Sequence, residues 1–235
     1  MWDNPRLLNA AAGFLVGLVV LASTLVGLSW LLRASPFPVR HVEVTTPLTH
    51  ASSAQMQVLL ARQGRGNFFA FPIDELRGAL ERLPWVRTAT VRRVWPDRLE
   101  IAIEEHVAFA RWGAGADLLV NTYGERFAGG SEASLPLFSG PQGTEGELTR
   151  RYQRFAALLA PLASPIERIV LSQRHAWSLR LANGLQITLG RDADLAEQRL
   201  ERFVEAYAGA VGTRLPQVVD LRYPNGFALR VKGGA

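Results

Sequence analysis

Hydrophobic positions along the chain first form one continuous run and then break into shorter periodic segments. Residues 10–32 carry no charged side chain over 23 positions. A helix of that length spans roughly 35 Å, enough to cross a hydrocarbon core of about 30 Å. The apolar region of a cleaved signal peptide is shorter, about 7 to 15 residues, and ends at small residues rather than at Leu31, Leu32 and Arg33. The pattern predicts an uncleaved transmembrane helix over 10–32, after a short stub over 1–9.

Residues 37–105 combine helical and alternating periodicity. Pro36 and Pro38 end the first helix, and residues 39–44 after them alternate as in a short strand. The predicted elements are, in chain order, a strand over 39–44, a helix between Ser52 and Gly64, a helix between Pro72 and Pro84, and strands over 86–94 and 98–105. This order predicts a β-α-α-β-β unit in which the helices cover one face of the sheet.

Two tryptophans of this unit stand beside prolines that fix turns. Trp85 follows Pro84, and Trp95 precedes Pro96. Large aromatic side chains usually supply much of the buried area of a small core. We therefore expect both tryptophans to anchor the core of this unit.

In residues 106–235, the alternation of apolar and polar positions that is typical of strands is more frequent than the helical period. The predicted elements are strands over 108–112 and 118–121, a surface crossing over 129–146, a helix from Thr149, a hairpin with its turn at Asn183-Gly184, a helix over 194–211, and two final strands on either side of Pro224-Asn225-Gly226. The pattern predicts a mostly antiparallel β domain with two packed helices. Combined with the predicted membrane helix and the β-α-α-β-β unit, this domain places the chain in the α+β class.

The last strand of the chain is a candidate binding surface. Phe227, Leu229 and Val231 alternate along it. A strand that ends a chain often lies at a sheet edge, where unpaired N–H and C=O groups can accept a strand from another protein. The pattern therefore suggests a partner-binding role for this strand.

Composition and charge exclude several other functions. The net charge is +5, but 25 of the 26 basic residues are scattered arginines without the motifs of a nucleic-acid-binding domain. With no cysteine, the chain has no disulfide, thiol nucleophile or iron–sulfur ligand. The histidines are far apart and lack metal-binding spacing: His41, His50, His106 and His175. The sequence predicts a protein that is not an enzyme and has no catalytic, cofactor or metal site.

The flanks of the predicted span leave two questions open. Arg6 on one side and Arg33 and Arg40 on the other give no clear charge asymmetry, so the positive-inside rule does not fix the orientation. Gly13 and Gly17 have the G-x-x-x-G spacing that allows close helix pairing, although glycine is common in membrane helices generally.

Short motifs occur in an order that resembles a known family. They are Gly66-Asn67-Phe68-Phe69, Leu83-Pro84-Trp85-Val86, Arg93-Val94-Trp95-Pro96, Glu104-Glu105, Leu171 to Trp177, Leu189-Gly190-Arg191, Arg202 to Glu205, and Val219 to Tyr223. The first four resemble a POTRA domain, and together the set resembles the FtsQ/DivIB family of bacterial cell-division proteins. The resemblance covers nearly the whole chain.

The resemblance implies a non-enzymatic, single-pass protein of the bacterial inner membrane. It implies a cytoplasmic stub over 1–9, a periplasmic POTRA domain over 37–105 and a periplasmic β domain over 106–235. Such a protein is a scaffold of the division complex, enriched at the septum and linking early and late division proteins. The expected partners are FtsB and FtsL at the β domain, and FtsK and other division proteins at the POTRA domain.

The resemblance also implies which residues touch the partner. Arg174, Tyr223, Asn225 and Gly226 occupy positions that contribute to FtsB contact in the family, and FtsB adds a strand to the last strand, which holds Phe227, Leu229 and Val231. Two rival hypotheses remain: a POTRA protein that handles outer-membrane polypeptides, and an anchored envelope hydrolase. Neither accounts as well for the last 60 residues.

Overall fold

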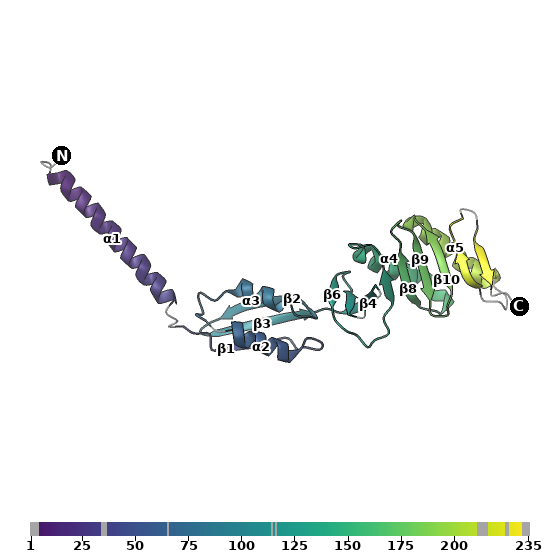
Figure 1. Cartoon of the computed structure of the whole chain (residues 1–235), viewed down its shortest axis with the longest axis horizontal. Helices are drawn as coiled ribbons and strands as arrows, with labels where there is room; N and C mark the ends of the chain where they lie inside the picture. Colours follow the sequence, from purple (N-terminus) through teal and green to yellow (C-terminus); the bar gives the residue numbers. More distant parts are fainter. Residues whose placement is uncertain are drawn as a thin grey trace. The chain divides into compact units, whose positions relative to one another are not determined.

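The computed structural model describes residues 5–33, 37–64, 66–113, 115, 117–210, 216–223 and 226–231. Internal contacts divide the chain into two compact units, Met1–Glu105 and His106–Ala235. Figure 1 shows the elements of both units, coloured along the sequence. Each unit is described by itself.

Helix α1, Pro5–Arg33, contains the predicted apolar span. Its segment Asn9–Trp30 has a mean hydropathy of 2.3, and none of it is buried against the rest of the chain. Two of the three hydroxyl groups in the span bond within the helix, since Thr24 donates to the carbonyl of Val20 and Ser29 to that of Val26. By length and composition, the helix can cross a membrane.

The rest of the N-terminal unit has the predicted β-α-α-β-β order. Its elements are β1 His41–Val44, α2 Ser53–Gln63, α3 Ile73–Leu80, β2 Val86–Val94 and β3 Arg98–Glu105. The sheet order is β1-β3-β2, with β1 parallel and β2 antiparallel to β3. Leu99, Ile101 and Ile103 on one face of β3 are buried. The alternation of β3 thus sets the core face of this sheet.

Two details of this unit differ from the sequence expectation. Helix α3 ends at Leu80 with Glu81 as its cap, before the predicted stop at Pro84. Trp85 is buried and stacks on His50, with 4.3 Å between ring centroids. Trp95 is 78% exposed, so the expectation that it anchors the core is wrong. Its turn extends beyond Val94 and Arg98, the last paired residues of the hairpin, where the ring reaches solvent.

The carboxylate of Glu105 ties the end of β3 to the segment before α2. It accepts hydrogen bonds from the backbone N–H groups of Thr49, His50 and Ala51, the shortest at 2.7 Å from Ala51. Burial acts to raise the pKa of Glu105, but these hydrogen bonds and the charge of His50 outweigh it and hold the pKa below its ordinary value of 4.5. The ionised carboxylate therefore stabilises this connection.

The C-terminal unit is built on one nine-stranded sheet of order β12-β11-β10-β9-β8-β7-β4-β5-β6. Its strands are β4 Ala108–Trp112, β5 Leu118–Asn121, β6 Arg126–Ala128, β7 Leu137–Ser139, β8 Ile166–Leu171, β9 Trp177–Leu181, β10 Gln186–Gly190, β11 Pro216–Asp220 and β12 Ala228–Val231. Three neighbouring pairs are parallel and five are antiparallel. The predicted α+β class and mostly antiparallel sheet are confirmed.

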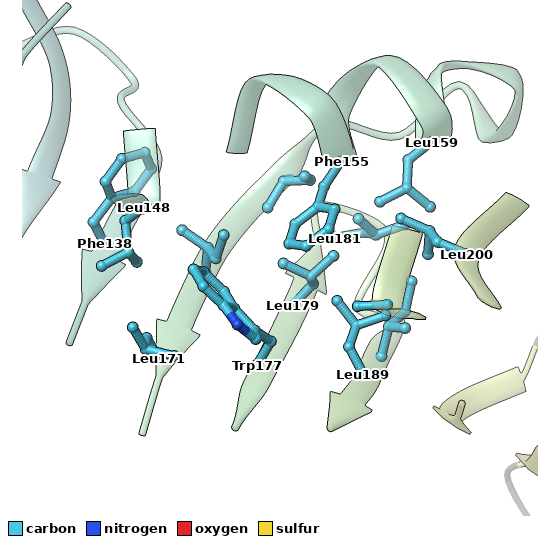
Figure 2. Close-up of a cluster of buried hydrophobic side chains, with 14 of the residues drawn as sticks. Phe138, Leu148, Phe155, Leu159, Leu171, Trp177, Leu179, Leu181, Leu189 and Leu200 are labelled. Atoms are coloured by element: carbon cyan, nitrogen blue, oxygen red, sulfur yellow. The ribbon is translucent and has the colours of Figure 1, made fainter. Parts of the chain in front are cut away.

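Helices α4, Glu145–Leu159, and α5, Ala193–Ala210, pack on this sheet, and the short helix η1, Ala160–Leu162, follows α4. Figure 2 shows Phe155 of α4 pointing toward Trp177 and Leu179 of β9. The rings of Phe155 and Trp177 meet edge to face at 5.9 Å. Both are almost fully buried. Phe155 and Trp177 lie in the core that holds the helices to the sheet.

The region predicted as a surface crossing, 129–146, contains structure that the pattern did not reveal. It holds β7, whose Phe138 is fully buried, and α4 begins at Glu145 rather than at Thr149. A three-residue strand shows only one alternation, so periodicity cannot identify it. For the same reason β6 was not predicted, and β8 was not predicted because a bulge between Ile166 and Arg168 breaks its alternation.

We expect Glu105→Gln to lower the free energy of unfolding of the N-terminal unit by about 1–3 kcal/mol at pH 7. Because folding lowers the pKa of Glu105, its contribution is complete above pH 4.5 and disappears as the pH falls through the folded-state pKa. The difference between the two proteins should therefore shrink in acid. Urea denaturation in detergent micelles and hydrogen exchange of residues 49–51, at pH 7 and pH 3, measure it.

The matched control is Glu104→Gln, because Glu104 is half exposed and pairs with Arg87 at the surface. It should change stability by less than about 1 kcal/mol. Equal effects of the two substitutions at pH 7 would contradict the role assigned to Glu105.

Candidate partner-binding site

Strand β12 lies at one end of the C-terminal sheet. It pairs antiparallel with β11, with Val219 opposite Leu229 and Asp220 opposite Ala228. Within the described part of the chain, β11 is its sole strand neighbour. Successive N–H groups of a strand point to opposite sides, so about half of those in β12 face away from β11. The predicted edge position of the last strand is observed.

Phe227 fixes the start of this strand to helix α5. Its half-buried ring meets Phe203 edge to face, with 5.5 Å between centroids and an interplanar angle of 88°. Phe203 is fully buried in the core. Among the predicted contact residues, Phe227 therefore holds the strand in place. Tyr223 and Leu229 are more accessible, at 53% and 40% exposure.

A groove of about 230 Å³ lies where α5 meets the segments on either side of the last turn. Tyr223, Gly226 and Phe227 line one side, so the structure brings three predicted residues together. The α5 side supplies Arg199 and Arg202, which sequence analysis did not select. Their i, i+3 spacing beside the buried stripe of α5 is the signal that places them on one helix face. The groove thus offers an aromatic and a cationic wall.

The ion pair of Asp220 and Arg222 orients the chain as it leaves β11. The guanidinium donates from Nε to both carboxylate oxygens and from Nη2 to Oδ2, the shortest of these hydrogen bonds being that from Nη2 at 2.6 Å. The bond from Arg222 lowers the pKa of Asp220 although burial opposes it, and Asp220 in turn raises the pKa of Arg222. The pair therefore stays ionised at neutral pH. It positions the backbone directly before Tyr223.

Arg174 lies in the tight turn between β8 and β9. The backbone groups of Ser172 and Ala176 pair at 2.9 Å, and the Ser172 hydroxyl oxygen accepts from the N–H of Ala176. This turn leaves Arg174 exposed to solvent. It lies at the same end of the sheet as Tyr223, because Trp177 opposite Gly190 starts β9 where β10 ends. Strand β10 separates the two positions, so Arg174 contributes a separate part of the surface.

Two of the residues predicted to contact the partner lie at the limits of the described chain. Asn225 lies outside the described residues, and the backbone of Val231 ends β12 without a described side chain. Their partner contacts stay predictions, as do those of the other site residues. Across the described ranges, no three His, Asp or Glu residues gather as metal ligands. The groups that do gather here suit contact with a polypeptide.

We expect Phe227→Ala to loosen β12 by removing its contact with Phe203. Truncation of a partly buried phenylalanine should cost about 1–3 kcal/mol of local stability, less than in a full core site. Hydrogen exchange of residues 216–220 and 228–231 should become at least about fivefold faster. Leu229→Ala is the control, because Leu229 is exposed on the same strand. Equal protection in Phe227→Ala and the unchanged chain would refute the anchoring role.

Comparison with known proteins shows two family matches along the chain. The family model for the POTRA domain, FtsQ-type, matches residues 37–106, and the model for cell division protein FtsQ/DivIB, C-terminal, matches residues 110–222. The two matches follow the order of the two compact units. They also confirm the resemblance seen in the sequence motifs.

Relatives match over almost the full length. The chain is 38% identical to cell division protein FtsQ of Burkholderia pseudomallei, over 99% of this chain and 95% of that protein. It is 38% identical to that of Nitrosospira multiformis, over 98% and 99%, and 30% identical to that of Neisseria gonorrhoeae, over 98% and 95%. The family matches and the apolar N-terminal helix together lead to one conclusion. The chain is a membrane-anchored protein that belongs to the FtsQ/DivIB family of cell division proteins.

Proposed function

We propose that the chain is a non-enzymatic scaffold of the division complex that captures a partner by strand addition at β12. The observation that carries this proposal is the one-sided pairing of β12 at the end of the nine-stranded sheet. An extended segment of the partner would continue the sheet through main-chain hydrogen bonds, while side-chain contacts give specificity. The family resemblance suggests FtsB as this segment, with FtsL in the same complex.

Other sheet edges are less suited to this role. On β2, the carboxylate of Glu81 accepts from the N–H of Ala89, which satisfies part of that edge. Edge strand β6 has three residues, and its Arg126 forms an ion pair with the buried Glu145 at 2.8 Å. Charged side chains and short length both discourage strand addition. These features favour β12 over β2 and β6, although β12 itself has four residues and one charged side chain, that of Arg230.

The groove beside β12 supports the same proposal. Tyr223 is an exposed aromatic residue next to two arginines of α5. Tyrosine and arginine are the residue types that most often dominate binding energy in interfaces. A partner segment with an apolar residue and nearby carboxylates would fit this surface. Arg174 would extend the contact along the end of the sheet.

We also propose how the remaining segments serve this scaffold. Helix α1 holds the protein in the inner membrane with residues 1–9 in the cytoplasm, and the domains over 37–105 and 106–235 lie in the periplasm. A domain of about 200 residues can be exported regardless of its charge, which is compatible with this orientation. The POTRA domain would recruit the protein to the septum through FtsK or other division proteins.

Proline substitutions along β12 test strand addition directly. Leu229 and Arg230 are adjacent, so one N–H faces β11 and the other faces the open side. Proline removes the N–H in either case. Hydrogen exchange of β11 identifies the variant that keeps β11 paired. We expect this variant to lose at least about tenfold in affinity for the purified FtsB–FtsL complex in detergent, a cost of about 1.4 kcal/mol.

The other proline variant, which breaks the pairing between β11 and β12, shows how much affinity is lost when β12 itself is displaced from the sheet. If the variant with intact β11 protection binds with unchanged affinity, strand addition at β12 is wrong. Hydrolysis of peptidoglycan by the full chain would contradict the non-enzymatic scaffold.

Tyr223→Ala should weaken the same capture by about tenfold, because truncation of a central tyrosine typically costs 1 kcal/mol or more. The matched control is Tyr123→Ala, since Tyr123 is 63% exposed in the same unit. Binding of both variants is measured by interferometry with the FtsB–FtsL complex. Similar affinities for the two variants would show that the groove does not take part.

A further inference from the structure

Within residues 37–105, the part of the N-terminal unit that follows α1, three aromatic side chains are exposed although most large apolar residues there are buried or half-buried. Phe37, Phe69 and Trp95 expose 50%, 49% and 78% of their surface. Phe37 and Phe69 meet edge to face at 5.3 Å. Exposing a tryptophan and two phenylalanines to water forgoes hydrophobic stabilisation, so their exposure calls for an apolar or interfacial neighbour.

Backbone contacts gather these three residues at one end of the unit. The N–H of Phe68 donates to the carbonyl of Phe37 at 2.8 Å, which joins the start of the unit to the turn that carries Phe69. The N–H of Arg40 donates to the carbonyl of Asp97 at 2.9 Å, which brings in the turn of Trp95. The three aromatic residues therefore occupy neighbouring segments.

A further contact links two of these segments through a side chain. The guanidinium of Arg93 donates to the carbonyl oxygens of Phe68 and Phe71, at 2.7 and 2.8 Å. Strand β2 thus holds the Phe69 turn directly beside the Trp95 turn. We call Phe37, Phe69 and Trp95 the aromatic end of the unit.

Covalent geometry limits how far this end can lie from the bilayer. Three residues, 34–36, separate the last residue of α1 from Phe37. Four extended steps reach at most about 14 Å. The headgroup layer on each side of a bilayer is about 5–8 Å thick. Phe37 therefore lies within about 14 Å of the end of α1, a reach that includes the headgroup layer.

The chemistry of this end matches that layer. Tryptophan and other aromatic residues are favoured at the membrane–water boundary, where their rings contact both acyl chains and headgroups. Trp30, at the end of the apolar span, is already a boundary residue with 70% exposure. The side chain of Arg40 lies 3.9 Å from the carboxylate of Asp97 but is 69% exposed, so it remains accessible to anionic phospholipid.

We propose that the aromatic end inserts into the headgroup layer of the bilayer that carries α1, with anionic phospholipid as its ligand. This contact makes the folded region of residues 37–105 a second membrane anchor beside α1. It limits the directions that the unit can take relative to the bilayer normal. The proposal depends on membrane insertion of α1 and is independent of strand addition at β12.

Site-directed spin labelling of the full chain in lipid nanodiscs tests the proposal. The chain has no cysteine, so a single one can be introduced without background. Ala70→Cys places a nitroxide next to Phe69, and Arg82→Cys places one after α3 as an aqueous reference. In nanodiscs with phosphatidylglycerol, we expect the ratio of oxygen to nickel-chelate collisions to be at least about threefold higher at residue 70, as for a headgroup location.

Variants of the aromatic end separate lipid contact from structural change. Adding Phe69→Ala and Trp95→Ala should bring the label at residue 70 close to the aqueous reference, whereas Trp95→Tyr should retain most of the lipid signal. Val58→Ala is the matched control, since Val58 is 53% exposed on α2. Hydrogen exchange of β2 and β3 verifies that each variant keeps its fold.

Two results would overturn the proposal. The label at residue 70 would be as accessible to the nickel chelate as the label at residue 82. Alternatively, residue 70 would become shielded after addition of another division protein but not by lipid alone, which would identify a protein surface. Neither result affects the binding test at β12.

Discussion

Main-chain pairing along β12 is the interaction on which the edge of the C-terminal sheet and the proposed strand addition both depend. On one side it closes the sheet against β11, and on the other it leaves backbone groups that water or another strand must satisfy. The same four residues therefore have to stay folded without a partner and remain open to one. The contact of Phe227 with Phe203 meets the first requirement from the helix side.

An open edge also has to avoid indiscriminate pairing. A strand of four residues offers few hydrogen bonds, and the exposed Arg230 places a charge in its middle. Both features disfavour association between identical copies, where arginines would meet one another. A partner that supplies an acidic residue removes this penalty. Under the proposed strand addition, the side chains of β12 would make the edge selective, and its position would make it accessible.

The sequence predicts a strand reliably only where its alternation of apolar and polar residues is long enough. Strands β2 and β3 alternate over eight or nine residues, and their bounds follow from the sequence. Strand β7 has three residues, and only the tertiary structure reveals that Phe138 is buried. The selection of Tyr223 came from the family resemblance and not from the strand pattern, because Tyr223 follows β11 and does not lie on the edge strand β12. The opposing arginines of α5 were not predictable, because pairing of a helix with a distant turn leaves no local pattern.

The number of available hydrogen bonds limits what strand addition alone can achieve. A net contribution of about 1 kcal/mol for each of two to four bonds gives at most about 4 kcal/mol, which corresponds to a Kd near 1 mM. Tighter binding by the proposed strand addition would therefore need additional free energy. Burial of Tyr223 in a partner surface adds some of it. Confinement of both proteins to one membrane adds more, because a tether raises the effective concentration of the partner segment at the edge. A weak edge combined with a membrane anchor then gives an interaction that is strong between anchored proteins and weak toward soluble ones.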